Sequence, residues 1–255
     1  MMEHLATDGQ EHKNNMFKIK MADLIIQIDN KYDFIKEQCK EYIVDSENVD
    51  IYASCTDEEI EKEGTCYEQK NVVSQGYCES ICIYRSICLQ MPKFDAFILH
   101  SAIAEVDGRA YAFAARSGTG KSTHLLLWKE CLGKRMTIIN GDKPIMRFLD
   151  GILYAYGTPW CGKEGWQTNA KAPLKAICFI QRSEENFINL LEKSKAAELI
   201  MQQTIIPKDA FGAMRTLELL DEMLQKTSTW LLGCNISIQA AMLSYNTMLG
   251  ENNEN

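Results

Sequence analysis

The sequence has few of the residues that commonly hold metals or bind nucleic acids. Its 255 residues include four histidines, and its ten cysteines form no C-x-x-C pair. Zinc sites are usually built from closely spaced Cys and His ligands, so no zinc site is predicted. The net charge is -8. Because nucleic-acid binders need clustered Lys and Arg to neutralise phosphates, no nucleic-acid partner is expected.

Segments that would place the chain in a membrane are also lacking. There is no run of about 18 apolar residues, the length that a spanning helix needs. The segment from His4 to Asn15 is polar, unlike the apolar region of a secretion signal. We therefore expect a cytoplasmic protein with reduced thiols and no membrane partner.

What is present is an ordinary globular composition, with 46% hydrophobic and 24% charged residues. The length suits one domain, or one domain with a small annex. We expect residues 1–15 to form a disordered lead and residues 16–95 an α+β segment packed on a core. Residues 96–249 would form that core, and residues 250–255 a loose tail.

Hydrophobic periodicity predicts a mixed α/β fold. Strands are expected at residues 17–28 (as a strand or hairpin), 51–54, 96–106, 110–115, 136–139, 145–148, 152–156 and 173–180. Helices are expected at residues 32–42, 56–64, 79–91, 122–131, 192–203, 209–227 and 240–249. Asp107-Gly108 and Asp150-Gly151 are type I′ hairpin signals, and Thr56 opens a capping box. Since hairpins alternate with strand-helix-strand units, the sheet should be mixed rather than purely parallel.

The strongest motif is A-R-S-G-T-G-K-S-T at residues 115–123, between an expected strand and an expected helix. That context is typical of a phosphate-binding loop. Glycines let the backbone turn so that successive N–H groups converge, and the helix N-terminus adds free N–H groups and a positive dipole end. The residues predicted to bind ATP are Ser117, Gly118, Thr119, Gly120, Lys121, Ser122 and Thr123. The alternative is a glycine-rich turn that precedes a helix by chance.

Individual residues of this loop have separate expected roles. Lys121 would supply a positive charge to the β- and γ-phosphates, and Ser122 a hydroxyl ligand for Mg²⁺. Ala115 stands where the pattern usually has its first glycine. His124, one turn into the helix, faces either solvent or the base, and Arg182 faces either the nucleotide or a surface carboxylate.

An acidic residue follows the next expected strand, in Asn140-Gly141-Asp142-Lys143-Pro144. Beside a phosphate loop, Asp142 would hold Mg²⁺ or accept the proton of an attacking hydroxyl. The same residue types also favour an ordinary turn. A loop at residues 157–165 is expected to lie over the site. In it Lys163 is a candidate for phosphate and Glu164 for metal, unless the loop is only solvated.

Taken together, residues 79–180 resemble the catalytic domain of HPr kinase/phosphorylase and related bacterial proteins. The resemblance rests on Leu99-His100, the phosphate loop, and the block around Asp142. It continues in Tyr156-Gly157-Thr158-Pro159-Trp160 and in the Asn-x-x-x-Pro-Leu-Lys-Ala-Ile segment at residues 169–177. It implies the P-loop fold with a mixed sheet that HPr kinase shares with phosphoenolpyruvate carboxykinase. The residues before 96 would be an added α+β segment.

The resemblance further implies ATP and Mg²⁺ as cofactors and transfer of the γ-phosphate to a hydroxyl, typically of serine. The acceptor would be a peptide, a protein or a small molecule. Lys121 and Ser122 match the phosphate and Mg²⁺ residues, and His100 matches a histidine beside the catalytic aspartate. Asp142 matches that aspartate, so Asp142, His100 and Lys121 are the expected catalytic residues. HPr kinase is a ring-shaped homo-oligomer, and no residue of this chain requires such assembly.

One departure keeps a second function open. Asp142 matches the second of two consecutive aspartates, and Gly141 stands in place of the first. The chain would then be either a kinase or a non-catalytic, nucleotide-binding regulatory protein with a degenerate acidic pair. A carboxykinase-like lyase is a third interpretation. Residues 16–95 carry no motif and are left with three roles: building sheet edges, binding the acceptor or self-association.

Overall fold

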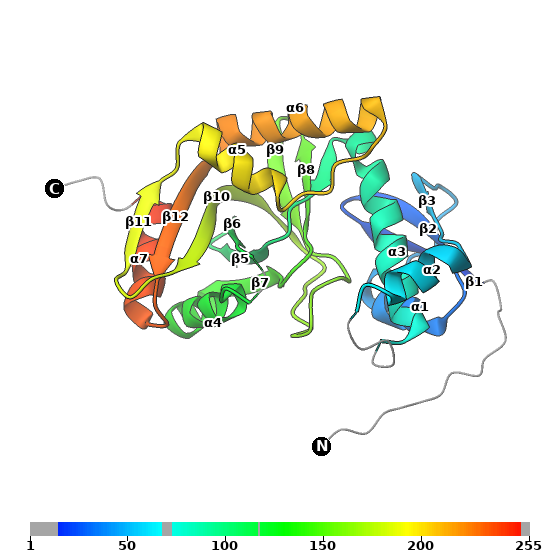
Figure 1. Cartoon of the computed structure of the whole chain (residues 1–255), viewed down its shortest axis with the longest axis horizontal. Helices are drawn as coiled ribbons and strands as arrows, with labels where there is room; N and C mark the ends of the chain where they lie inside the picture. Colours follow the sequence, from blue (N-terminus) through cyan, green and yellow to red (C-terminus); the bar gives the residue numbers. More distant parts are fainter. Residues whose placement is uncertain (1–14, 68–72, 117, 251–255) are drawn as a thin grey trace, which may run out of the picture.

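The computed structural model describes residues 15–67, 73–116 and 118–250. Labels follow Figure 1. The helices are α1 (Asp33–Gln38), η1 (Lys40–Tyr42), α2 (Asp57–Gly64), α3 (Gln75–Gln90), η2 (Met91–Phe94), α4 (Lys121–Leu132), η3 (Gly133–Arg135), α5 (Lys193–Met201), α6 (Ala210–Lys226) and α7 (Ile238–Leu249). The strands are β1 (Asn15–Met21), β2 (Leu24–Asn30), β3 (Ile51–Ala53), β4 (Ala96–Ile98), β5 (Ala102–Val106), β6 (Arg109–Ala114), β7 (Met136–Asn140), β8 (Ile145–Leu149), β9 (Ile152–Tyr156), β10 (Lys171–Arg182), β11 (Phe187–Leu190) and β12 (Ser228–Cys234). The disordered lead and loose tail expected at the two ends lie, apart from Asn15 and Gly250, outside the described residues.

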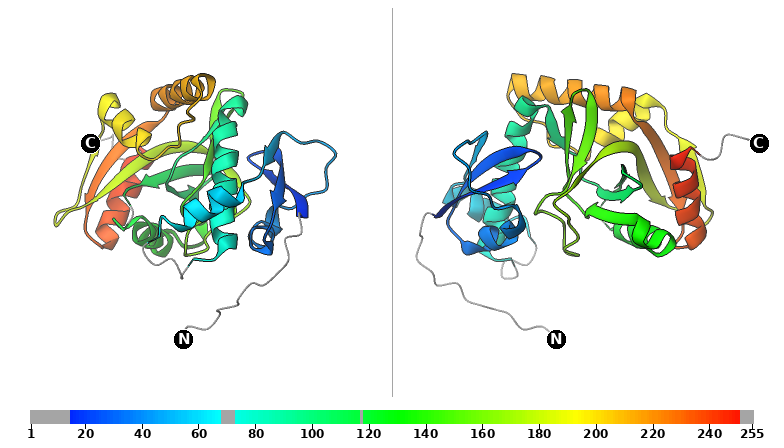
Figure 2. Two further views of the ribbon diagram at one scale, coloured as in Figure 1. Left: turned by 45° about the vertical axis from the view of Figure 1, so that its right-hand side comes forward. Right: turned by 180° about the vertical axis from the view of Figure 1, so that it is seen from behind.

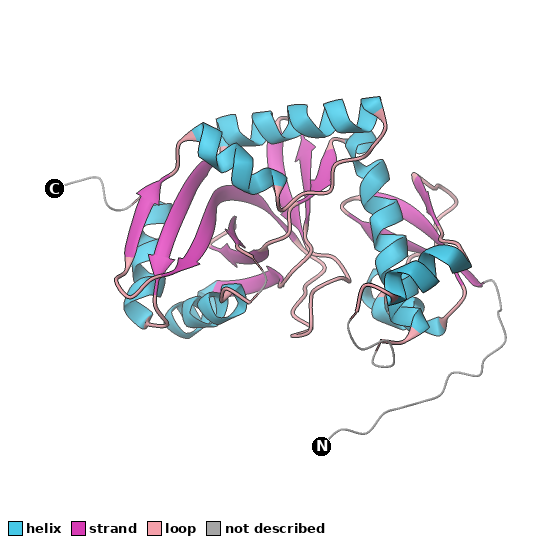
Figure 3. Cartoon of the chain, in the orientation of Figure 1, coloured by secondary structure: helices cyan, strands magenta, loops and turns pink. Residues whose placement is uncertain are grey.

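The larger sheet has nine strands and is mixed, as the sequence predicts. Its order is β4-β8-β9-β10-β6-β5-β7, with β12 paired to β10 and β11 paired to β12. Strand β10 is parallel to β6 and β12, whereas its first residues, 171–173, are antiparallel to β9. One long strand therefore joins two differently paired halves, and the sheet curls between them (Figures 1 and 3).

Apolar residues on both sides of this sheet explain why its central strands read as nearly continuous hydrophobic runs. In β6, Ala112 faces a cluster that includes Leu219 of α6, while the next residue, Phe113, faces a cluster that includes Trp128 of α4. The period-2 alternation of a strand thus sends successive side chains into two different cores. Helices α5 and α6 cover one face, and α4 and α7 cover the other.

A smaller three-stranded sheet, β1-β2-β3, forms with α1, α2 and α3 a separate group of elements beside the large sheet (Figure 2). Its hydrophobic cluster extends to residues of the large sheet, Ile145 among them. Polar contacts join the same parts: the Tyr42 hydroxyl donates to Gln167 Oε1 at 2.8 Å, and Asp23 forms an ion pair with Lys171. The division of the chain into domains stays a prediction.

Most of the expected helices and strands are confirmed, with ends that differ from the expected ones by a few residues. Thr56 forms the predicted capping box with Glu59 at the start of α2. At the two hairpin turns Asp107 and Asp150 have φ near +50°, each followed by a glycine with positive φ, as a type I′ turn requires. Within the described residues no helix has the length and apolar character needed to cross a membrane.

Two expectations about strands are wrong. Residues 96–106 form two strands rather than one, because the backbone leaves the ladder at residues 99–101. There the His100 N–H donates to the Gln203 carbonyl and the Ser101 N–H to the Asp142 carbonyl. In addition, β11 and β12 were not predicted. Strand β12 begins two residues after α6 ends, so no turn signal separates it from the helical pattern.

Candidate functional site

The direction of the strands explains why motifs far apart in the sequence meet. Strand β5 is antiparallel to both β6 and β7, so β6 and β7 point the same way and end at the same edge of the sheet. Strand β6 ends at Ala114, just before the phosphate loop, and β7 ends at Asn140, just before Asp142. Strand β5 begins at this edge, two residues after His100. The sheet therefore carries His100, Asp142 and the loop to one place.

The loop between β6 and α4 has the backbone that its glycines permit. Gly118 has φ +74° and Gly120 has φ +123°, and a Cβ built at either would meet no atom within 4 Å. Glycine is needed there for conformation rather than for space. Gly120 precedes α4 without a side-chain cap among the described residues, so the first amides of this helix suit an anion. Ser117 lies outside the described residues.

Lys121 is held across this loop. Its ammonium donates to the Ala115 carbonyl at 3.0 Å, and the residue is 9% exposed. Burial lowers the pKa of Lys121, while the nearby Asp142 carboxylate opposes that shift. In this structure the ammonium has a backbone oxygen as its partner, and an anionic oxygen would be a stronger acceptor.

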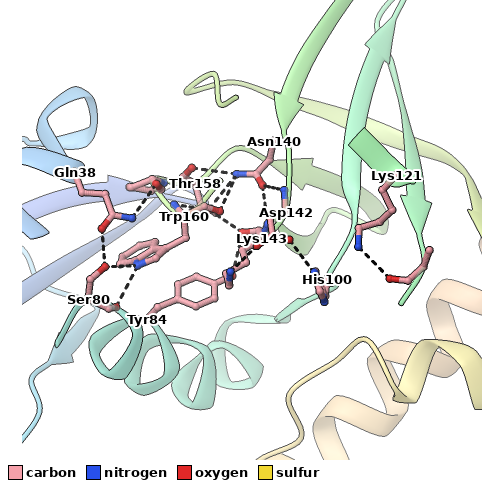
Figure 4. A network of polar contacts seen from close by, with 12 residues as sticks. Gln38, Ser80, Tyr84, His100, Lys121, Asn140, Asp142, Lys143, Thr158 and Trp160 are labelled. Carbon is pink, nitrogen blue, oxygen red and sulfur yellow. Dashed lines mark hydrogen bonds and ion pairs between the residues drawn. The ribbon is translucent and has the colours of Figure 1, made fainter. Parts of the chain in front are cut away.

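Asp142 is the centre of a second polar cluster (Figure 4). Its Oδ1 lies 2.8 Å from His100 Nε2, and its Oδ2 forms an ion pair with Lys143. Burial by itself raises the pKa of the Asp142 carboxyl, but the hydrogen bond to His100 and the Lys143 ammonium outweigh it. The pKa is therefore held well below its usual range, and Asp142 is ionised at neutral pH.

Asn140 fixes the backbone that carries this carboxylate. Its side-chain oxygen accepts from the N–H groups of Asp142 and Lys143, at 2.8 and 2.7 Å, and its amide nitrogen donates to Thr158. Asn140 is fully buried. This is the turn that Asn favours at a strand end, used here to aim Asp142. The two sequence interpretations, a turn and a functional acid, are thus compatible.

Gly141 is enclosed by the loop that follows. Its N–H donates to the Trp166 carbonyl at 2.9 Å, and a Cβ built on it would lie 2.8 Å from the Cys161 carbonyl oxygen. A side chain there requires the backbone of this loop to move. The loop thus occupies the space that a carboxylate at position 141 would need.

Introducing a carboxylate at this position is accordingly expected to harm the protein. Gly141→Asp should lower the free energy of unfolding by about 1–3 kcal/mol, the usual cost of overpacking, and should not raise ATP turnover. Urea unfolding of Gly141→Asp and Gly141→Ala measures the first effect. Gly64→Ala is the matched control, since its Cβ would meet only Cys78 Sγ at 3.8 Å. A stable Gly141→Asp protein with increased turnover would contradict the expectation.

The phosphate loop and Asp142 line one cavity of about 770 Å³. Ser122, Asp142 and Glu164, the three expected metal residues, all line it. A hydroxyl and two carboxylates suit Mg²⁺, which is typically held by one or two carboxylates together with substrate phosphates. The donor chemistry therefore fits this ion. Lys163 lines the same cavity, so the loop at residues 157–165 lies at the site as expected.

The sequence did not indicate the other residues of this cavity. Phe34, Gln38, Tyr77 and Ile81 also line it, and all four belong to the N-terminal segment. No motif marks them, and only tertiary contacts bring them within reach of the phosphate loop.

His124 needs one correction, since it does not face solvent; its contact with a base stays a prediction. It is 3% exposed, and its Nε2 lies 2.9 Å from Ser244 Oγ. That hydroxyl donates to the Ala241 carbonyl, so His124 must be the donor to it. Its Nδ1 is buried with no partner among the described residues. Desolvation therefore lowers the pKa of His124 to about 4, and the ring is neutral.

Arg182 makes no ion pair with a surface carboxylate among the described residues, and its contact with the nucleotide stays a prediction. Its Nη2 donates to the Gly118 carbonyl at 2.6 Å. It therefore braces the phosphate loop from the end of β10 instead of pairing with a surface carboxylate.

No protein-family model matches the chain, and no curated protein matches it. Among solved structures, the chain is similar to the HPr(Ser) kinase/phosphatase from Coxiella burnetii, with 9% sequence identity and a TM-score of 0.37. The similarity covers 60% of this chain and 92% of that chain. So distant a likeness carries no conclusion about chemistry, and membership of the HPr-kinase-type family stays a prediction.

Proposed function

We propose that this protein is an ATP-dependent kinase that transfers the γ-phosphate to a hydroxyl, such as that of serine. One observation carries the proposal: an ionised, half-buried aspartate and the uncapped start of α4 line the same cavity. The first group suits an acceptor hydroxyl and the second a polyphosphate. Phosphoryl transfer needs little more from a protein than such positioning and charge neutralisation.

In the proposed reaction, ATP lies with its phosphates over residues 118–122. The acceptor oxygen forms a bond to the γ-phosphorus, and the bond between that phosphorus and the β–γ bridging oxygen breaks, which leaves ADP. The acceptor proton passes to Asp142 Oδ. Since the pKa of Asp142 is held low, the carboxylate orients the hydroxyl and takes its proton late, as a loose transition state allows.

Other residues of the cavity assist these steps. Lys121 turns from the Ala115 carbonyl to the phosphates and neutralises their charge. His100 holds the Asp142 carboxylate in position. Mg²⁺, if held by Ser122 together with Asp142 or Glu164, would supply further positive charge to the β- and γ-phosphate oxygens.

A second candidate is a non-catalytic protein that binds a nucleotide and regulates a partner. It is favoured by Gly141, which leaves one acidic residue where the resembling family has two. It is also favoured by the ion pair with Lys143, which occupies one oxygen of that single acid. Both functions require nucleotide binding, and only the kinase requires turnover.

Incubation of the protein with Mg²⁺ and γ-labelled ATP separates the two. The kinase predicts binding in calorimetry, slow release of ADP and label transfer to added serine peptides. Binding without any ADP release would favour the regulatory protein. Absence of nucleotide binding at millimolar Mg·ATP would contradict both.

A further inference from the structure

The cavity lined by the phosphate loop and Asp142 has a second wall, which carries no charged side chain. This outer wall consists of Phe34, Gln38, Tyr77 and Ile81, from α1 and α3 of the N-terminal segment. Phe34 is 43% exposed although it is a large apolar residue. An apolar side chain exposed inside a cavity is a feature of binding sites rather than of plain surface.

The outer wall is fixed to the loop after β9 by hydrogen bonds (Figure 4). Gln38 Nε2 donates to the Pro159 carbonyl at 3.1 Å, and Gln38 Oε1 accepts from Ser80 Oγ at 2.6 Å. Trp160 Nε1 in turn donates to the same Ser80 hydroxyl at 2.9 Å. The loop after β9 and the two N-terminal helices therefore form one connected frame around the cavity.

The two aromatic rings of the wall are also held in place. Helices α1 and α3 approach so closely that a Cβ on Gly76 would lie 2.7 Å from Phe34 Cβ. The rings of Phe34 and Tyr77 meet edge to face, with centroids 6.1 Å apart. This arrangement is favourable for aromatic pairs, so a ligand meets a preformed apolar surface.

Charge divides the cavity into two ends. The inner end carries Lys121, Asp142, Lys143 and Glu164, whereas the four residues of the outer wall have no charge. The single amide of that wall, on Gln38, is already hydrogen-bonded to the protein. A small, strongly polar acceptor would find few groups there to orient it, since such sites depend on well-placed polar groups. A neutral apolar group would fit.

From this juxtaposition we infer that the N-terminal segment is the acceptor-binding part of the proposed kinase. Phe34 and Tyr77 select a serine-containing peptide in which a residue next to the serine is aromatic or branched aliphatic. The serine hydroxyl reaches Asp142 while its apolar neighbour packs on the outer wall; neighbouring residues of an extended chain lie about 3.3 Å apart along the strand. The inference rests on the proposed function and adds the class of acceptor.

Label transfer from γ-labelled ATP to three pentapeptide amides tests it: acetyl-Gly-Leu-Ser-Phe-Gly, acetyl-Gly-Gly-Ser-Gly-Gly and acetyl-Gly-Asp-Ser-Asp-Gly. The wild type should have a kcat/KM for the apolar peptide at least about tenfold above that for the glycine peptide, the discrimination typical of an apolar pocket. Phe34→Ala should bring this ratio close to one. Phe211→Ala, on the exposed face of α6, should leave it as in the wild type.

A variant with a changed peptide preference distinguishes a role in selecting the acceptor from simple loss of folding. Phe34→Lys should prefer the aspartate peptide over the apolar one, because an ammonium then faces the acidic neighbours of the serine. Equal use of all three peptides by the wild type, a ratio unchanged in both Phe34 variants, or equal transfer to glycerol would overturn the inference.

ADP formation with ATP alone, measured in parallel, distinguishes failure of the proposed function from failure of the inference about the acceptor. If the wild type neither binds ATP nor forms ADP, the proposed function itself is wrong. If it forms ADP and labels the three peptides indifferently, only the inference about the acceptor is wrong. If it forms ADP but labels no peptide, the inference is wrong and the kinase is left with a hydroxyl acceptor other than these peptides.

Discussion

Replacing Lys121 with methionine is expected to lower ATP turnover by at least about a thousandfold. Methionine keeps an aliphatic side chain in the buried space and removes the ammonium. The loss of that positive charge is the change that affects a bound phosphate. Removing one preorganised charge from a water-poor site commonly costs two to three orders of magnitude. The loop of a phosphate-binding motif adds to this because its lysine contacts both the γ-phosphate that is transferred and the β-phosphate that leaves with ADP.

The measurement is steady-state ADP release at saturating Mg·ATP, with affinity determined separately by calorimetry. Lys134→Met, on the exposed η3 turn, is the matched control and should behave as the wild type. Thermal melting shows whether Lys121→Met is folded, since the Ala115 carbonyl loses its partner in this variant. Turnover at the wild-type rate in a folded Lys121→Met protein would refute the assignment of the phosphate loop.

Replacing Asp142 with asparagine is expected to lower phosphoryl transfer by about 10²–10⁴-fold, the range for a positioned acid or base. Asparagine has nearly the same shape, so the contact with His100 can persist. What disappears is the negative charge that orients the acceptor hydroxyl and receives its proton. Nucleotide binding should change by only a few fold, because Lys121 and the amides of α4 remain.

Binding and transfer must therefore be measured on the same preparation. Asp150→Asn is the control, because Asp150 is exposed in the β8–β9 turn and asparagine tolerates its positive φ equally well. Unchanged transfer in Asp142→Asn would remove the proposed role of this carboxylate. A loss of nucleotide binding as large as the loss of transfer would instead make Asp142 chiefly a ligand of the bound metal and nucleotide.

Local patterns predicted much of the fold, and their failures share one cause. The strand expected at residues 96–106 is interrupted at Leu99, which is fully buried, so the apolar pattern continues while the hydrogen bonding does not. Strand β12 was missed since a helical pattern runs almost into it. In both cases the deciding interaction is made with a residue distant in the sequence, and periodicity does not record it.

In the candidate site, too, some features follow from local sequence patterns and others depend on residues distant in the sequence. The loop at residues 115–123 could be singled out as a candidate phosphate loop because such a loop depends on backbone conformations that only certain residues adopt. The role of Gly141 could not be judged, since the obstacle to a side chain there is the Cys161 carbonyl of a later loop. For His124 the expectation of a solvent-facing ring is wrong, because the ring packs in a buried environment beside Ser244 of α7.

By itself, then, the sequence determined a mixed α/β chain with a glycine-rich loop opening a helix and an acid at the end of a nearby strand. These are local properties, set by glycine conformations, hydrophobic period and turn residues within about ten positions. Only the tertiary structure decided that β5 lies between β6 and β7, which brings His100 and Asp142 to the loop. It also decided that Phe34 and Tyr77 close the cavity. Packing between distant segments fixes such positions, because each side chain settles where its burial and hydrogen bonds are satisfied together.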